Sequence, residues 1–356
     1  MVNLNKAVAI LEKYKKPVWQ EIKKYLQDDS YPTAFKIPAK YQKDIEFYWK
    51  IVKDYPERQG KYLRPTLLLL AAKAMGADIK KAIKTASAMQ LSEEWLLIHD
   101  DIQDHSFARR GKPALQRLYG NELALNAGDT LHVIMWKILL DNHQVLGAEK
   151  SLAIANEFYQ VLKRTADGQA IEIMWAKDEK IRTNDKDWFF IADGKTAYYT
   201  IAAPLRLGGI IAGASKKQLD LLAKFGLQLG RCFQLVDDTL DLTSNYKGLD
   251  QKIGNDIYEG KKTLILSHLI RTANKSDKKK IIAILKKTPE EKTDKEVKWI
   301  LQKMADYKSI DYAKKIALKL KETAYQIFEN DLGFLKEKSA RQELKTLIEF
   351  VLERKH

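Results

Sequence analysis

The stretch Ile98–Pro113, IHDDIQDHSFARRGKP, combines three aspartates with a pair of arginines. It follows an apolar run without glycine or proline, ASAMQLSEEWLL, which predicts a helix. Residues i and i+4 share a face of a helix, so Asp100 and Asp104 point the same way and Asp101 lies beside them. Carboxylate oxygens suit Mg²⁺, which commonly bridges to substrate phosphates, and the arginines Arg109–Arg110 suit phosphate through bidentate hydrogen bonds. The stretch therefore predicts a metal and phosphate site, and a solvated acidic turn followed by a basic one is the alternative.

A second stretch, Phe233–Leu242, repeats the aspartate pattern as FQLVDDTLDL. Its Asp237, Asp238 and Asp241 again close an apolar run that is free of glycine and proline. The two clusters are too far apart in the chain to share one helix. If their helices face each other, six carboxylates converge on one cavity, which is very costly unless a cation joins them. The repetition favours a metal site over two unrelated acidic turns.

With these motifs the chain resembles the trans-isoprenyl diphosphate synthases, from about Gly60 to Thr263. The motifs of that family occur here in order: GKYLRP at 60–65, DDIQD with RRGKP, GQ at 168–169, GKT at 194–196, FQLVDDTLD, and KIGND with GKKT within 252–263.

The resemblance implies an all-α fold, a single large helical bundle of the isoprenoid synthase type with a central cavity. The composition agrees, because only 8 prolines and 17 glycines are present and no Ser/Gly-rich linker divides the chain. We therefore expect one domain over residues 1–356. The implied activity is a Mg²⁺-dependent ionisation of an allylic diphosphate, with capture by isopentenyl diphosphate and loss of a proton. Three magnesium ions per active site and a homodimer are further implications of the resemblance.

Carried over by position, the resemblance assigns a role to each motif residue. It implies direct magnesium binding by Asp100, Asp104 and Asp237, supporting or water-mediated metal binding by Asp101, Asp238 and Asp241, and a place for Asp256 in the water shell. It implies allylic-diphosphate contacts for Arg109, Lys195, Lys252 and Lys261. It implies isopentenyl-diphosphate contacts for Gly60, Lys61, Arg64 and Arg110. Thr196 and Gln234 would lie beside the reacting carbons, with Asp100, Asp104, Asp237 and Lys195 completing the catalytic set.

One position departs from the family pattern. The family usually has His or Gln seven residues before the first aspartate, as a donor to isopentenyl diphosphate, and Glu93 stands there. A carboxylate cannot donate a hydrogen bond to phosphate unless it is protonated. We expect Glu93 to pair with Lys61 or Arg64 instead and to hold that side chain in the substrate site.

Product length is expected to depend on residues one to two turns before Asp100, where the growing tail runs along the helix. Trp95 lies five residues back, roughly 7.5 Å along the axis, and Leu96 lies one turn back. An aromatic residue followed by an aliphatic one at this point resembles enzymes that stop at geranylgeranyl diphosphate. We therefore favour the twenty-carbon product, with farnesyl diphosphate as the alternative and a purely structural Trp95 as a third possibility.

The net charge of +15 first suggests a nucleic-acid partner. The lysines are spread through the chain without a basic stripe interleaved with aromatics, so we expect no nucleic acid and only some steering of anionic ligands. Neither the N-terminal MVNLNKAVAILEKYKK nor the longest apolar run, LLLLAA, is long enough to insert stably in a membrane. The single cysteine, Cys232, excludes an internal disulfide and favours a reducing, cytoplasmic compartment.

Two other functional classes remain. A class I terpene cyclase shares the first acidic motif, but such enzymes resemble each other in lacking the second DDxxD that this chain has. A non-catalytic partner subunit of a synthase typically loses one of the two acidic motifs, and both are intact here.

Periodicity and breakers outline the helices around these motifs. We expect helices over 1–30, 39–53 with a stop at Pro56, 65–76, 79–104, 113–119, 121–141, 149–177, 185–212 with an interruption near Pro204, and 216–243. A further helix is expected to restart at Lys262, and the tail 276–356 reads as helices broken near Pro289 and Gly333. No strand is expected.

Overall fold

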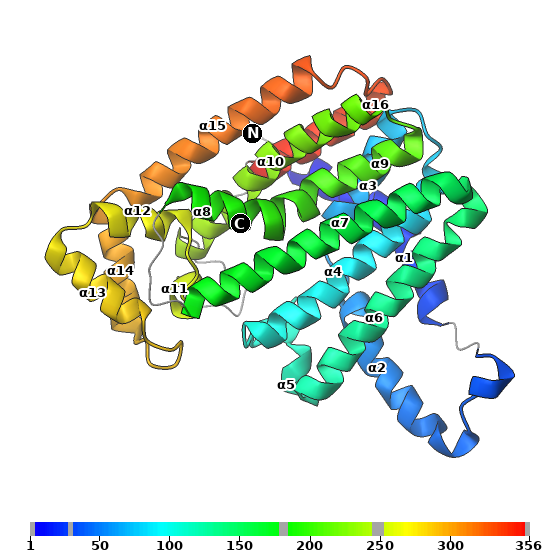
Figure 1. Ribbon diagram of the computed structural model, residues 1–356, viewed down its shortest axis with the longest axis horizontal. Coiled ribbons are helices and arrows are strands. Elements are labelled where there is room, and N and C mark those ends of the chain that lie inside the picture. The colour runs from blue at the N-terminus through cyan, green and yellow to red at the C-terminus, as the bar shows by residue number, and fades with distance from the viewer. Residues whose placement is uncertain (1–3, 28–30, 178–183, 244–252, 353–356) are drawn as a thin grey trace.

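A computed structural model describes residues 4–27, 31–177, 184–243 and 253–352 of the chain. These residues are almost entirely helical, which confirms the all-α fold class (Figure 1). The order of elements is α1 Leu4–Leu26, η1 Thr33–Phe35, η2 Ala39–Tyr41, α2 Gln42–Arg58, α3 Leu63–Ala74, η3 Ile79–Ala82, α4 Ile83–Gln103, β1 Ala108–Arg109, β2 Lys112–Pro113, α5 Leu115–Tyr119, α6 Asn121–Asp141, α7 His143–Lys177, α8 Asp185–Ile191, η4 Ala192–Ala202, α9 Ala203–Ala212, α10 Lys216–Thr243, α11 Asn255–Glu259, α12 Leu264–Thr272, α13 Lys275–Leu285, α14 Asp294–Asp306, α15 Ser309–Asn330 and α16 Lys338–Leu352.

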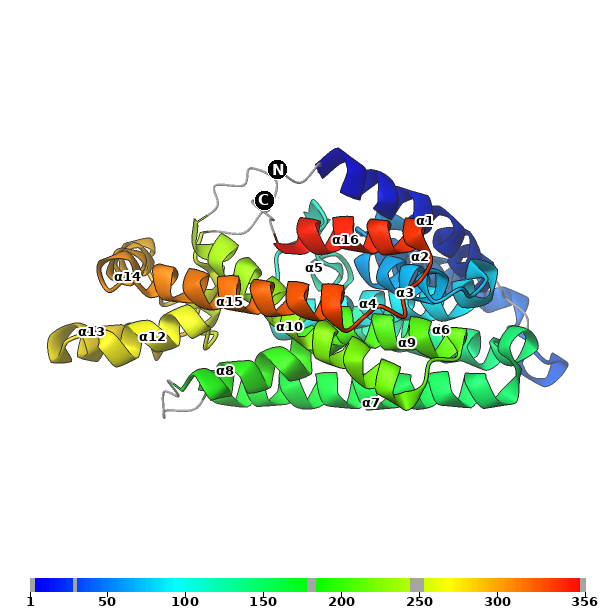
Figure 2. The same cartoon turned by 90° about the horizontal axis from the view of Figure 1, so that it is seen from above.

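The long helices form a bundle around α4 and α10, which carry the two aspartate clusters. Helix α4 packs against α6, α3 and α1, and α10 packs against η4, α15 and α9. Helix α7 lies along η4 and α9, and Figure 2 shows it on one face of the bundle with α1 and α16 on the opposite face. The nearly continuous apolar surface of α3, from Leu67 to Ala72, is fully buried in this arrangement. Each aspartate cluster therefore lies on a helix that is fixed from several sides.

A second, smaller hydrophobic cluster joins α12, α13 and α14 at one end of the molecule (Figure 1). Its core includes Leu264, Ile281, Val297 and Met304, all buried. Phe189 packs against both clusters, which connects this end to the main bundle. Ile257 of α11 belongs to the second cluster, and α11 also contacts α10 of the main bundle.

Several expectations were wrong in detail. A two-residue antiparallel hairpin, β1–β2, follows α4 although no strand was expected. Its loop residues Arg110 and Gly111 have φ of 54° and 74°, as a tight two-residue turn of the primed type requires. Helix α2 continues through Pro56 into its last turn, and the chain passes Pro204 without a break because the ring lies at the first turn of α9, where its missing N–H is tolerated. Residues 192–202 form a π-helix instead of an α-helix.

Helix α6 deserves separate notice for its apolar surface. By length and composition alone, it is the one helix among the described residues that could cross a membrane, and 39% of its most apolar window is buried inside the structure. The longest uninterrupted apolar run of the sequence, LLLLAA, lies in α3 and therefore did not indicate α6. It packs against α4, yet Val133 and Leu140 stay 68% and 71% exposed. Part of one face of α6 is therefore apolar and uncovered in the isolated chain.

Candidate active site

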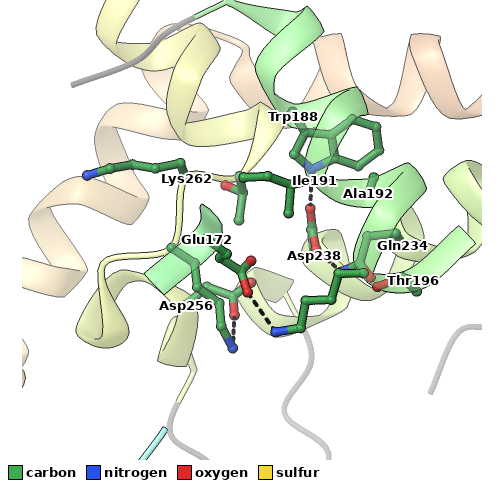
Figure 3. Close-up of a pocket in the computed structure, with 12 residues that line it drawn as sticks. Glu172, Trp188, Ile191, Ala192, Thr196, Gln234, Asp238, Asp256 and Lys262 are labelled. Atoms are coloured by element: carbon green, nitrogen blue, oxygen red, sulfur yellow. Dashed lines mark hydrogen bonds and ion pairs between the residues drawn. The ribbon is translucent and has the colours of Figure 1, made fainter. Parts of the chain in front are cut away.

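Ion pairs of Lys195 and Lys261 link the first aspartate cluster to a polar cavity, which Asp238 of the second cluster lines together with these two lysines. The Lys195 ammonium lies 3.5 Å from the Asp100 carboxylate, and the Lys261 ammonium lies 3.4 Å from Asp104 and 3.7 Å from Asp256. On the other side, the backbone N–H of Asp256 donates to Asp241. The cavity has a volume of about 80 Å³. Figure 3 shows several of its lining residues, which are Glu172, Trp188, Ile191, Ala192, Lys195, Thr196, Gln234, Asp238, Asp256, Lys261, Lys262 and Thr263.

Burial makes these carboxylates costly to ionise together. It raises the pKa of Asp104 and of Asp256 to about 6 and that of Asp241 to about 7. Asp100 is the exception: burial opposes its ionisation, but Lys195, Lys261 and Arg109 outweigh this and lower its pKa. A cation bound next to these carboxylates would favour their ionised form and so lower their raised pKa values.

The donor set fits magnesium. All the clustered acids offer hard oxygen ligands, which Mg²⁺ prefers. Among the described residues no three of them already form a metal cage, and the ammonium groups of Lys195 and Lys261 stand between them. Mg²⁺ is usually held by one or two carboxylates together with substrate phosphates, so this open arrangement matches a metal that arrives with a diphosphate.

Two of the six motif aspartates are held by hydrogen bonds from neighbouring side chains. Asp101 is fully buried and accepts hydrogen bonds from the Tyr55 hydroxyl at 2.5 Å and from the Arg109 guanidinium, with Nε at 3.0 Å. Asp238 accepts hydrogen bonds from the Trp188 indole at 3.1 Å and the Gln234 amide at 2.7 Å, and burial raises its pKa well above the ordinary value (Figure 3). Both carboxylates are engaged by neighbouring side chains, and their expected supporting or water-mediated part in metal binding stays a prediction.

Sequence reasoning missed three residues that these contacts bring into the site. Glu172 forms a 2.6 Å ion pair with Lys195, and Glu259 forms one of 2.5 Å with Lys261. Trp188 supports Asp238 from α8. Only Glu172 left a usable signal, because it lies three residues after the motif residue Gln169 and so shares its helix face. Gln169 itself donates to Asp100 at 3.2 Å.

The π-helix η4 places Lys195 and Thr196 at the cavity. π-Helical turns are rare and are often found at functional sites. Gly168 on α7 lies directly under this segment, since a Cβ built on Gly168 would come within 2.7 Å of the Lys195 backbone nitrogen. The GQ motif of α7 therefore lies against the GKT motif of η4. Glycine is needed at position 168 because a side chain there would collide with the backbone of η4.

This contact leads to a test of the packing. We expect Gly168→Ala to push Lys195 away from Asp100 and to lower turnover by about tenfold or more, because small displacements of positioned groups are catalytically costly. The measurement is steady-state turnover beside the thermal unfolding temperature. Gly333→Ala is the matched control, since a Cβ there would meet nothing within 4 Å. Equal activity of the two variants would contradict the positioning role of Gly168.

A cationic pocket lies next to this site, at the start of α3. Arg64 forms a 3.0 Å ion pair with Glu93 and donates to the Thr200 hydroxyl at 2.9 Å. The expected pairing of Glu93 is thereby confirmed for Arg64. Arg110 lies against Gly60, where a Cβ would come within 2.8 Å of its guanidinium. Lys61 is exposed beside them, and the predicted substrate residue Lys252 lies outside the described residues.

A larger, mainly apolar cavity of about 370 Å³ extends from Asp100 along α4, α7 and η4. It is lined by Arg64, Glu93, Trp95, Leu96, Leu97, His99, Asp100, Gln103, Leu162, Thr165, Ala166, Gln169, Ala170, Ile173, Lys195, Thr196, Tyr199 and Thr200. Both expected length-determining residues, Trp95 and Leu96, line it. The Trp95 indole stacks on His132 of α6 with centroids 4.1 Å apart, and the indole N–H of Trp136 donates to the His132 ring at 2.8 Å. Trp95 is thus braced from α6.

Known proteins resemble this chain over most of its length. The family model for polyprenyl synthetase matches residues 46–304. A short chain isoprenyl diphosphate synthase of Methanothermobacter thermautotrophicus is 32% identical over 297 residues, which cover 83% of this chain and 87% of that protein. A geranylfarnesyl diphosphate synthase of Natronomonas pharaonis is 30% identical over 313 residues, with the same coverage. The crystal structure of a geranylgeranyl pyrophosphate synthetase from Pyrococcus horikoshii superimposes with a TM-score of 0.82 at 28% identity, covering 99% of each chain.

Proposed function

The chain belongs to the polyprenyl synthetase family and is a prenyl diphosphate synthase of isoprenoid biosynthesis, and we propose that it makes geranylgeranyl diphosphate. Enzymes of this kind are prenyltransferases that join isopentenyl diphosphate to an allylic diphosphate. The observation that carries the proposed product is the apolar cavity beside Asp100, with Trp95 in its lining and braced by His132. Farnesyl diphosphate is the alternative product.

The proposed chemistry uses the chain's own groups as follows. Asp100, Asp104 and Asp237 would hold magnesium, three ions per site, and the bound metal would supply positive charge to neutralise the departing diphosphate. Lys195 and Lys261, which now bridge the acids, would turn their ammonium groups to the allylic diphosphate. Thr196 lines the polar cavity and the apolar one, and in this proposal its hydroxyl would stabilise the positive charge that develops on the allylic carbon.

In this proposal, Asp101 and Asp238 position neighbouring side chains. Asp101 fixes the Arg109 guanidinium, and Tyr55 fixes Asp101 in turn. Asp238 fixes Gln234, with Trp188 behind it. Held in this way, Arg109 and Gln234 would reach the allylic substrate without losing their orientation.

The product profile is the direct test of the proposed product. The enzyme is incubated with isopentenyl diphosphate, Mg²⁺ and, in separate reactions, dimethylallyl, geranyl or farnesyl diphosphate. We expect elongation to stop at twenty carbons from each primer. Accumulation at fifteen carbons supports the alternative, and release of hydrocarbons without consumption of isopentenyl diphosphate would indicate a cyclase. A chain that condenses only when a second synthase is added would be a partner subunit.

We also propose a homodimer without membrane insertion. The apolar residues Leu125, Val133 and Leu140 of α6 are exposed in the isolated chain, and so is Leu152 of the neighbouring α7. An exposed apolar stripe on a bundle of this size fits a two-fold interface. Gel filtration should give twice the monomer mass. The buried thiol of Cys232, whose pKa burial raises to about 12, supports a cytoplasmic location in which no disulfide is needed.

The Arg64–Glu93 pair allows a separate prediction. We expect Glu93→Gln to be tolerated and to lower the Michaelis constant for isopentenyl diphosphate, because Gln removes a negative charge from the pocket and adds a donor. The constant for the allylic substrate should stay unchanged. Loss of catalysis by a folded Glu93→Gln enzyme would instead show that the carboxylate itself takes part in the reaction.

A further inference from the structure

Two consecutive carboxylates of α4, those of Glu93 and Glu94, pair with Arg64 and Arg110. These arginines belong to the cationic pocket proposed to bind isopentenyl diphosphate, the acceptor substrate, and this pocket is called the acceptor pocket below. Glu93 pairs with Arg64 at 3.0 Å. Glu94 pairs with Arg110 through both of its oxygens, at 2.9 Å and 3.1 Å. Sequence reasoning considered Glu93 only. The charge that an incoming diphosphate would meet at these arginines is therefore already compensated within the protein.

Burial shields Glu94 from water completely and Glu93 in part. Glu94 is fully buried and accepts a further hydrogen bond from the Gln90 amide at 2.7 Å. Glu93 has one carboxylate oxygen, Oε2, that is buried without a hydrogen-bond partner. A diphosphate that reaches Arg64 and Arg110 would bring further negative charge next to these two groups, where water screens it little. A negative charge that approaches a carboxylate favours its protonated form.

Building on the proposed function, we propose that Glu93 and Glu94 act as a carboxylate pair that takes up one proton when the acceptor diphosphate binds. The step forms one O–H bond on a carboxyl oxygen of the pair, with the proton taken from solvent, and it breaks no other bond. The protonated carboxyl replaces the lost charge compensation and supplies a donor where a carboxylate has none. The proton belongs to the pair, since two adjacent acids titrate together.

Among the described groups named below, none other than this pair can take up a proton near neutral pH. Arg64 of α3, with Arg109 and Arg110 from the hairpin, stays charged at any pH of interest. The hydroxyls of Tyr62 and of Tyr199 on η4 stay protonated, because burial raises the pKa of both far above neutral. For Glu94, burial raises the pKa to about 7, Arg110 opposes the rise and Glu93 adds to it. Glu94 is thus close to protonation before any diphosphate arrives.

The direction of the pH dependence follows from linkage. Since binding raises the pKa of the pair, acceptor affinity should increase as the pH falls from about 8 towards 7, over the range where the free pair is ionised. The affinity for the allylic diphosphate, which binds at the aspartate clusters, should not follow the same curve. Glu93 and Glu94 would thus affect the binding of isopentenyl diphosphate and not the binding of the allylic diphosphate.

Calorimetry can count the proton directly. Isopentenyl diphosphate is titrated into the enzyme near pH 8 without allylic substrate, so no turnover occurs, in buffers of different ionisation enthalpy. We expect uptake of about one proton per acceptor bound in the wild type. We expect its loss in Glu94→Gln and in Glu93→Gln. The proton that the diphosphate itself carries cancels in this comparison.

Two variants serve as controls. Glu57→Gln removes an exposed carboxylate of α2 near the Gly60 loop and should keep the full uptake. Glu93→Gln leaves the Arg110 pair intact, so it remains a fair test if Glu94→Gln fails to fold. The carboxylate-pair proposal would be overturned if the wild type bound isopentenyl diphosphate without proton uptake, or if uptake persisted in folded Glu93→Gln and Glu94→Gln. Either result would leave the proposed function standing. Failure of the wild type both to bind and to condense isopentenyl diphosphate would overturn both.

Discussion

Replacing Asp100 or Asp237 with Ala is expected to lower turnover by about two to three orders of magnitude or more, as removal of one strong electrostatic contact to a transition state does. Asp100 is held in its charged form by Lys195, Lys261 and Arg109, so it offers an ionised oxygen at neutral pH. The second cluster, on α10, contributes Asp238 to the polar cavity, and Asp241 accepts a hydrogen bond from the backbone N–H of Asp256 in the cavity lining. Loss of either cluster removes one side of the proposed metal site.

The fold should survive these changes. Removing Asp100 breaks its partly exposed ion pair with Lys195, which costs little stability, so the unfolding temperature should change only slightly. Asp167→Ala on α7 is a matched control, because its carboxylate is exposed and forms only a 3.7 Å pair with Lys163. Circular dichroism and thermal unfolding, with and without Mg²⁺ and pyrophosphate, give a readout besides activity. Full activity in EDTA, or Mg²⁺-dependent stabilisation that is equal in wild type and Asp100→Ala, would refute the metal site.

Replacing Trp95 with Ala is expected to extend the product from twenty carbons to twenty-five or more. The indole lines the 370 Å³ cavity and is fixed by its stack on His132, so it cannot move aside for a longer tail. Ser92, which bonds the Tyr199 hydroxyl at 2.9 Å, and Met89 lie deeper on α4 and are smaller. Truncation should therefore open space in the direction in which the tail grows.

Chromatography of the products, at equal extents of reaction, measures this change. A Trp→Ala change in a packed core costs about 3–5 kcal/mol, and we expect less at Trp95 because it already borders a cavity. Trp299→Ala, on α14 in the second hydrophobic cluster, controls for general loss of stability and should keep the wild-type product. An unchanged product length in an active Trp95→Ala enzyme would place the floor of the cavity at other residues.

The amino-acid sequence by itself determined the helices and the spacing of the acids on them. The bounds expected for α6 and α10 agree with the structure, because helical periodicity and breakers such as Gly120 are local signals. The shared face of Asp100 and Asp104 also follows from local geometry, since a helix repeats every 3.6 residues. The ordered motifs were enough to indicate the family that the comparisons show.

Only the tertiary structure decided which of these acids face the cavity. Asp101 accepts a hydrogen bond from Tyr55, 46 residues earlier in the chain, and Asp238 accepts one from Trp188, 50 residues earlier. Glu94 finds Arg110 only because the β1–β2 hairpin folds back onto α4. Spacing along a helix fixes the direction of a side chain, but its charge state and its partner depend on the distant segments that pack against it. That packing is set by the whole core and leaves no pattern in the local sequence.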